Sequence, residues 1–185
     1  MARRPAVFFD RDGVVNVSPG DGYVLNWSGF EFSPGIFEAT RLCRDRGYAL
    51  VVVTSQQGVG KELMSQADLD FIHQQMQDML RVQGAPFDAI EACTHLSGTC
   101  TCRKPSPEMI HRAAAELDLD LSQSWLVGDH DRDIQMAINA GVPHTIRVLS
   151  HHAPTVSAEH TISSPAELPA LLGHVLRVGG IQKPA

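Results

Sequence analysis

The chain has 185 residues, of which 43% are apolar and 19% are charged, and its formal net charge at pH 7 is −6. This length and composition suit one globular domain with a full hydrophobic core and exclude a wholly disordered chain. No apolar run approaches the roughly 20 residues of a membrane-spanning helix, and an acidic chain without a basic block is not suited to broad nucleic-acid binding.

Short apolar segments and helical segments alternate along the chain. In chain order, we expect a strand at 6–9, a helix that Ser33 opens and Gly47 ends, a strand at 49–53, a helix from Ser65 to Gly84, and a strand at 87–92. A helix at 107–119, a strand at 124–128, a helix over 133–139 closed by Gly141, a strand at 144–149 and a last helix from Ser164 follow. Most of these boundaries carry capping residues, namely serine before the helix and glycine after it.

The apolar segments predict the fold class. Four of the five are largely apolar without alternation, which is typical of parallel strands that are buried on both faces. Alternation of such strands with helices predicts a doubly wound α/β fold with a mostly parallel sheet. We expect a single domain over residues 1–185, with a loose tail at about 179–185.

Polar residues follow these strands where a sheet of this kind binds its ligands, at the carboxyl ends of the strands. Asp10 and Asp12 follow the first strand. One carboxylate can attack a phosphorus atom and form an aspartyl-phosphate, while the other protonates the leaving oxygen and later activates water. The alternative is that two short acidic residues simply end a strand in a turn.

Asp129 follows the fourth strand and adds a third carboxylate. A carboxylate nucleophile and a phosphate repel each other unless a hard cation lies between them, and Mg²⁺ takes one or two carboxylates and a phosphate oxygen. Asp10 and Asp129 can supply this pair, with the backbone carbonyl of Asp12. We expect Asp133, one helical turn further on, to orient the site or cap the helix.

Three further residues suit a phosphate group, although each also has an ordinary structural explanation. Thr54 and its neighbour Ser55 offer a hydroxyl and backbone amides where the second strand ends, but such residues are also common in turns. Lys104 offers a point charge for a phosphoryl group, although without the neighbouring metal cluster an exposed surface lysine would be the better explanation.

Four soft metal ligands lie in one loop directly before Arg103 and Lys104. The set comprises Cys93, His95, Cys100 and Cys102, and it suits tetrahedral Zn²⁺ without an open position better than it suits free buried thiols. Such a closed site activates no water, so we expect it to hold the loop 93–102 and its two cations against the crevice. The N-terminal segment lacks the features of a secretion signal, so we expect a cytoplasmic protein, where thiols bind metal rather than form disulfides.

The segments FFDRDG, VVVTS, CRKP and LVGDHDRD, which span residues 8–133, together resemble the haloacid-dehalogenase (HAD) phosphatase superfamily. The resemblance implies Asp10 as nucleophile, Asp12 as acid and base, and Thr54 and Lys104 as stabilisers of the phosphoryl group. It implies Mg²⁺ on Asp10, Asp12 and Asp129, and Zn²⁺ on the four loop ligands. The spacing of the motifs leaves no room for a large cap domain.

The zinc loop followed by CRKP is similar to one branch of the superfamily, which contains heptose-bisphosphate and histidinol-phosphate phosphatases. Gly22 and Tyr23 lie in a segment similar to the GYV loop of the heptose enzymes, which favours removal of the 7-phosphate of a heptose 1,7-bisphosphate, with histidinol phosphate as the alternative. The residues expected to contact substrate are Gly22, Tyr23, Ser55, Gln56, Arg103 and His130.

The chain departs from the family pattern at three places. Ser55 stands where the family often has asparagine, His130 stands where the heptose enzymes have lysine, and the loop between His95 and Cys100 has the short length of the histidinol enzymes. We expect a monomer that acts on a small phosphorylated metabolite, with neither nucleic acid nor membrane as a partner. A non-enzymatic zinc module is the competing class, and the acidic charge and lack of aromatic–basic interleaving argue against it.

Overall fold

The computed structural model describes residues 3–178, and its centre is one six-stranded sheet with the strand order β3-β2-β1-β4-β5-β6. The strands are β1 (Ala6–Phe9), β2 (Ala49–Ser55), β3 (Ala89–Cys93), β4 (Trp125–Gly128), β5 (His144–Val148) and β6 (His160–Ile162). All neighbouring strands of the sheet pair in parallel. The doubly wound α/β prediction is thus confirmed, whereas the tail predicted at 179–185 lies outside the described residues.

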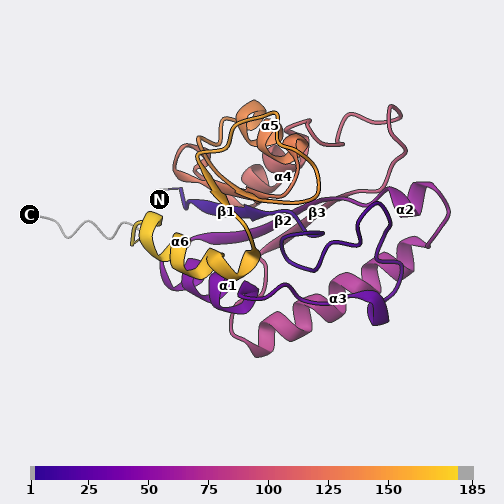
Figure 1. The fold of residues 1–185 in the computed structure, drawn as a ribbon, viewed down its shortest axis with the longest axis horizontal. Helices are drawn as coiled ribbons and strands as arrows, with labels where there is room; N and C mark the ends of the chain where they lie inside the picture. Colours follow the sequence, from indigo (N-terminus) through magenta and orange to yellow (C-terminus); the bar gives the residue numbers. More distant parts are fainter. Residues whose placement is uncertain (1–2, 179–185) are drawn as a thin grey trace, which may run out of the picture.

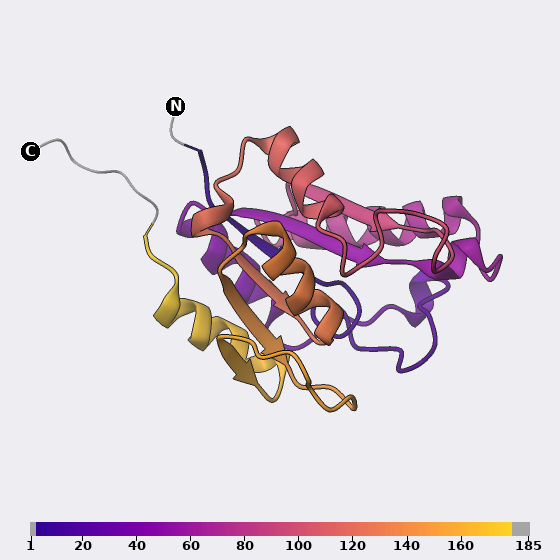
Figure 2. The same ribbon diagram turned by 90° about the horizontal axis from the view of Figure 1, so that it is seen from above.

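Helices cover both faces of the sheet, as Figures 1 and 2 show. The helices are α1 (Ile36–Asp45), α2 (Gln57–Gly60), α3 (Gln66–Val82), α4 (Glu108–Leu117), α5 (Asp131–Ala140) and α6 (Leu168–Val175), with 3₁₀ turns η1 (Trp27–Gly29), η2 (Leu121–Gln123) and η3 (Pro165–Glu167). Helices α1, α3 and α6 pack on one face, and α4 and α5 on the other. None of the helices in residues 3–178 has the length and apolar content needed to cross a membrane.

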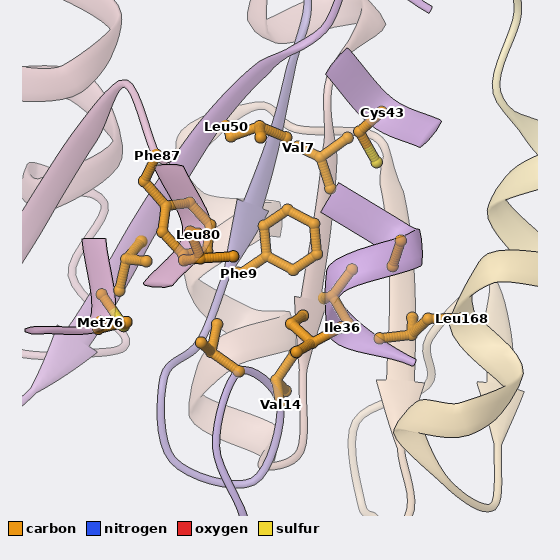
Figure 3. Packing of buried hydrophobic residues seen from close by; sticks show 14 of the residues in the cluster. Val7, Phe9, Val14, Ile36, Cys43, Leu50, Met76, Leu80, Phe87 and Leu168 are labelled. Atoms are coloured by element: carbon orange, nitrogen blue, oxygen red, sulfur yellow. The ribbon is translucent and has the colours of Figure 1, made fainter. Parts of the chain in front are cut away.

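The apolar strands supply two hydrophobic cores because successive side chains of a strand point to opposite faces of the sheet. Phe9 of β1 lies in the core beneath α1 and α3, where its ring meets that of Phe87 edge to face at 5.8 Å (Figure 3). Phe8, its neighbour, lies in the opposite core with residues of α4 and α5. Both phenylalanines are fully buried, so β1 is fixed rigidly at the centre of the molecule.

Capping chemistry sets several helix boundaries as expected. The Ser65 hydroxyl accepts from the backbone N–H of Asp68, whose side chain accepts from the Ser65 backbone, and α3 begins there. Gly141 ends α5 with φ of 77°, a left-handed conformation that glycine adopts at little cost.

The structure differs from the prediction at short elements. Strand β3 begins and ends later than the expected range 87–92, and both β6 and the four-residue helix α2 were not predicted. The β6 sequence His-Thr-Ile contains one buried residue, Ile162, and is too short to show a period. Helix α2 contains two glycines, which disfavour a helix on intrinsic propensity.

Candidate active site

A cavity opens at the carboxyl ends of β1, β2 and β4, where the strand order reverses. Its lining includes ten of the predicted residues: Asp10, Asp12, Gly22, Tyr23, Thr54, Ser55, Arg103, Lys104, Asp129 and His130. Strands β1 and β4 are hydrogen-bonded neighbours, which explains why residues more than a hundred positions apart share one cavity. The predicted convergence of carboxylates, hydroxyls and cations is therefore present in the structure.

Lys104 lies at the centre of a buried ion-pair group. Its Nζ is 2.7 Å from Oδ1 of Asp10 and 2.6 Å from Oδ1 of Asp133. Although burial opposes its charge, the two carboxylates raise the pKa of Lys104. Asp133 also accepts from the backbone N–H of His130 at the start of α5, so it both caps the helix and fixes the lysine, as its position in the sequence predicts.

Asp10 and Asp129 form an electrostatically crowded pair. Burial, followed by the charge of Asp133, raises the pKa of Asp10 to about 8 and the pKa of Asp129 to about 6. Carboxylate oxygens of Asp10, Asp129 and Asp133 all lie within 4.8 Å of one another. Lys104 supplies only one positive charge to these three carboxylates, so the group still needs a cation, and the hard oxygens of Asp10 and Asp129 fit Mg²⁺.

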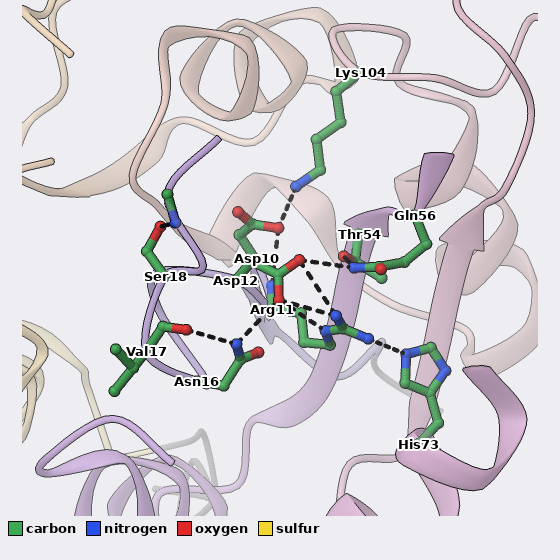
Figure 4. A network of polar contacts seen from close by, with 11 residues as sticks. Asp10, Arg11, Asp12, Asn16, Val17, Ser18, Thr54, Gln56, His73 and Lys104 are labelled. Atoms are coloured by element: carbon green, nitrogen blue, oxygen red, sulfur yellow. Dashed lines mark hydrogen bonds and ion pairs between the residues drawn. The ribbon is translucent and has the colours of Figure 1, made fainter. Parts of the chain in front are cut away.

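Asp12 is held by three side chains, two from its own segment and one from the segment after β2 (Figure 4). Arg11 Nη2 donates to its Oδ1 at 2.9 Å, Asn16 Nδ2 donates to the same oxygen at 3.0 Å, and Gln56 Nε2 donates to Oδ2 at 2.9 Å. Although burial opposes ionisation, the Arg11 guanidinium and these donors lower the pKa of Asp12. The side chain is therefore ionised and fixed in one orientation, which suits a proton acceptor.

Gln56 has a different place from the one expected of a substrate contact. Its side chain is fully buried, and its Nε2 donates to Asp12 and, at 2.8 Å, to Oγ1 of Thr54. It lies outside the set of residues that line the cavity. The assignment of Gln56 to substrate binding is therefore corrected. It is a positioning residue, because its buried amide donates to Asp12 and Thr54, which line the cavity.

The support that Arg11 provides is a feature not expected from the sequence analysis. Arg11 is fully buried, and its Nη1 is 3.2 Å from Nε2 of His73 on α3. Burial and the Arg11 charge lower the pKa of His73 to about 4, so the neutral ring can accept a hydrogen bond from the guanidinium. A charged residue between two aspartates at a buried strand end is the signal that could have indicated a buried ion pair.

Two polar atoms at the cavity have no partner within residues 3–178, namely Ser55 Oγ and Arg103 Nη1. Both are buried, and buried polar atoms normally have hydrogen-bond partners. Both residues line the cavity, so a ligand can supply the missing partners. Arg132, His151 and His152 also line the cavity, and the sequence did not identify them as site residues.

The cysteine–histidine loop follows β3 and forms a compact ligand set. The Cys93 and Cys100 sulfurs are 3.5 Å apart, and His95 Nδ1 lies 3.8 Å from Cys93 Sγ and 3.4 Å from Cys102 Sγ. Tetrahedral zinc with ordinary bond lengths of 2.0–2.3 Å separates its ligands by about 3.3–3.8 Å. The geometry is therefore compatible with a zinc-binding loop, and Arg103 and Lys104 follow its last ligand directly.

Comparisons with known proteins find phosphatases that match most of the chain. A family model described as HAD-hydrolase-like matches residues 101–172. The D-glycero-β-D-manno-heptose-1,7-bisphosphate 7-phosphatase of Yersinia pestis is 34% identical over 177 residues, covering 89% of this chain and 93% of that protein. The D-glycero-α-D-manno-heptose-1,7-bisphosphate 7-phosphatase of Burkholderia mallei is 37% identical over 179 residues, covering 91% and 94%.

Solved structures show the same similarity. The crystal structure of D,D-heptose 1,7-bisphosphate phosphatase from B. bronchiseptica, complexed with magnesium and phosphate, superimposes with a TM-score of 0.82 at 29% identity. The match covers 92% of this chain and 98% of that one.

Proposed function

Because the chain belongs to the HAD-like phosphatase family of the D-glycero-D-manno-heptose-1,7-bisphosphate 7-phosphatases, we propose that it hydrolyses the 7-phosphate ester of a D-glycero-D-manno-heptose 1,7-bisphosphate. One observation supports the proposed reaction directly. The buried carboxylate of Asp10 meets Lys104, Asp129 and Asp12 in one cavity, and this set of groups suits transfer of a phosphoryl group to a carboxylate.

In this reaction Asp10 forms the bond to phosphorus. Its Oδ1 accepts from Lys104 Nζ at 2.7 Å and from the Arg11 backbone N–H at 2.8 Å, so Oδ2 is the oxygen free to attack. Bond formation between Oδ2 and phosphorus accompanies cleavage of the bond from phosphorus to the sugar oxygen. Lys104 and the Thr54 hydroxyl then lie beside the transferred phosphoryl group and stabilise its charge.

Asp12 moves the protons. It takes up a proton from solvent as the dianionic phosphate binds and gives this proton to the departing sugar oxygen; in the second half of the reaction its carboxylate takes a proton from the attacking water. That water breaks the aspartyl–phosphate bond, which releases inorganic phosphate and regenerates Asp10. The hydrogen bonds from Arg11, Asn16 and Gln56 keep Asp12 on the side of the cavity where both transfers occur.

Two metal ions complete the proposal. Mg²⁺, held by Asp10, Asp129 and the Asp12 backbone carbonyl, supplies positive charge between the carboxylates and the substrate phosphate. Zn²⁺ on Cys93, His95, Cys100 and Cys102 has a structural role and supports the segment that carries Arg103 and Lys104.

We also propose that the chain works as a single-domain cytoplasmic monomer. The gathering of three thiols around one histidine, which is typical of a metal site rather than a disulfide framework, supports this location.

A direct comparison of substrates tests the proposed reaction. We expect kcat/KM for heptose 1,7-bisphosphate to exceed that for histidinol phosphate by about 10²-fold or more, because buried polar groups such as Arg103 lose a partner on the wrong substrate. Both anomers of the bisphosphate should be assayed, and phosphorus NMR of the product should show the remaining phosphate on C1. A preference for histidinol phosphate, or loss of the C1 phosphate, would contradict the proposal.

Gly13 provides a second test, because it faces Asp129. Its φ is +90°, and a Cβ at this residue would lie 2.4 Å from Oδ2 of Asp129. We expect Gly13→Ala to displace that carboxylate and to lower kcat by about 10²-fold, the usual effect of a displacement of roughly 1 Å in a catalytic group.

Gly141→Ala is the matched control for this variant. Gly141 has a similar φ of +77°, but a Cβ there would meet nothing within 4 Å. Both substitutions place alanine in the left-handed region at a cost of about 1–2 kcal/mol in unfolding free energy, which urea denaturation measures. Equal turnover in the two variants would show that Gly13 matters only for backbone conformation.

A further inference from the structure

Three metal-ligating side chains outside the proposed magnesium and zinc sites meet at the mouth of the cavity. Asp21 lies in the segment between β1 and η1, and His151 and His152 lie in the segment after β5. One ligand atom from each lies within 4.8 Å of the others. We propose that Asp21, His151 and His152 form a second transition-metal site, which binds a divalent ion of the Zn²⁺ class and links the two loops across the cavity mouth.

The spacing of the donor atoms supports this assignment. His151 Nε2 is 3.5 Å from Oδ1 of Asp21, and the rings of His151 and His152 have centroids 3.9 Å apart. A tetrahedral ion with Zn–N and Zn–O bonds of 2.0–2.2 Å separates its ligands by about 3.3–3.6 Å. The three donor atoms, which lie within 4.8 Å of one another, are therefore near the spacing that one ion requires, whereas a simple His–Asp ion pair accounts for only one of the two imidazoles.

The donor types define the class of ion. Neutral imidazole is the commonest ligand for zinc and its neighbours in the transition series, whereas Mg²⁺ prefers a site made of oxygen atoms. The Asp21 side chain is 93% exposed and that of His151 is 53% exposed, so an ion can enter from solvent. With three protein ligands, one coordination position stays open, which distinguishes this site from the closed cysteine–histidine loop.

The position of the two loops determines how a bound ion would affect the cavity. The hydroxyl of Ser150 donates to the backbone carbonyl of Asp129 at 3.1 Å, so the second loop is anchored directly beside the proposed magnesium ligand. The ring of His152 lies 4.9 Å from that of His130. All three ligands line the cavity, and one ion bound to both loops closes them over its entrance.

Titration with ZnCl₂ tests the site without any measurement of turnover. Before the titration, the protein should already hold zinc in its cysteine loop, and excess MgCl₂ should occupy the carboxylates of the active site. We expect calorimetry to show one further equivalent of zinc on the wild type. Affinity should fall more than about tenfold in Asp21→Asn, His151→Gln and His152→Gln, because each removes one ligand.

Two controls separate this site from other surface histidines and from the proposed reaction. His111→Gln removes an exposed histidine of α4 and should bind zinc like the wild type. Asp10→Asn should also keep the further equivalent, so failure of the phosphatase proposal would leave this result unaffected. Melting curves should show that the three ligand variants are folded.

Hydrogen exchange tests the link between the loops. We expect zinc to slow amide exchange together in residues 18–24 and 150–156 of the wild type, and in neither segment of His152→Gln. The proposal is overturned if the wild type binds no further equivalent, if the ligand variants bind as tightly as the wild type, or if only one of the two loops is protected.

Discussion

Replacing Asp10 by asparagine is expected to lower phosphate release by at least about 10⁴-fold, because an amide oxygen does not form the covalent bond to phosphorus on which the proposed reaction depends. The two side chains have nearly the same shape, so the loss reports on chemistry rather than on packing. Release of inorganic phosphate in the presence of Mg²⁺, measured under single-turnover conditions, gives the rate of the chemical step.

The same substitution is not expected to lower the free energy of unfolding. Burial, followed by the charge of Asp133, raises the pKa of Asp10 to about 8, so the ionised form is unfavourable in the folded protein, and an uncharged asparagine removes this free-energy cost. Lys104 keeps its 2.6 Å ion pair with Asp133. We therefore expect Asp10→Asn to remain folded with an unfolding free energy at or above that of the wild type.

Asp45→Asn is the matched control, since Asp45 ends α1 on an exposed surface and undergoes the same chemical change. It should retain full turnover. Unchanged turnover in Asp10→Asn would refute the nucleophile assignment, and an unfolded Asp10→Asn would show that the carboxylate is needed for the fold.

The second large effect is expected from Cys102→Ser. Cys102 is buried and its sulfur lies 3.4 Å from His95 Nδ1, so serine removes a thiolate from a closed ligand set. We expect loss of bound zinc and a decrease of about 4 kcal/mol in unfolding free energy, the value for a ligand at about a thousand times its dissociation constant. Elemental analysis and urea denaturation measure the two quantities.

Turnover should fall in the same variant, because Arg103 and Lys104 follow Cys102 directly. Lys104 is held between Asp10 and Asp133, and a loose segment before it weakens both ion pairs. Cys43→Ser is the control: Cys43 is an equally buried thiol on α1 in the other core, and its variant should keep the zinc. Full metal content together with wild-type stability in Cys102→Ser would contradict the structural role.

Strands could be predicted from the sequence where the apolar runs were long enough to indicate a buried parallel strand. The segments that became β1, β2 and β4 are buried along nearly their whole length, so the polar residues after them had to lie at one edge of the sheet. The placement of Asp10, Thr54 and Asp129 in one cavity therefore follows from a general property of parallel sheets and not from details of this chain.

Side-chain support could not be predicted in the same way. Gln56 was assigned to substrate on its position after β2, but the direction of its side chain depends on how the chain turns into α2. The contact between Arg11 and His73 joins residues 62 positions apart, and the approach of Asp21 to His151 joins two loops. Such contacts depend on the path of loops, which no local period describes.

The central place of β1 in the sheet has a consequence for the order of synthesis. β1 lies between β2 and β4, so one of its edges stays unpaired until β4 has left the ribosome. At about 5–20 residues per second, the roughly 120 residues from the end of β1 to the end of β4 take about 6–24 s to make. During that interval one edge of β1 carries unpaired backbone N–H and C=O groups, and a fragment truncated before β4 contains Asp10 without Asp129.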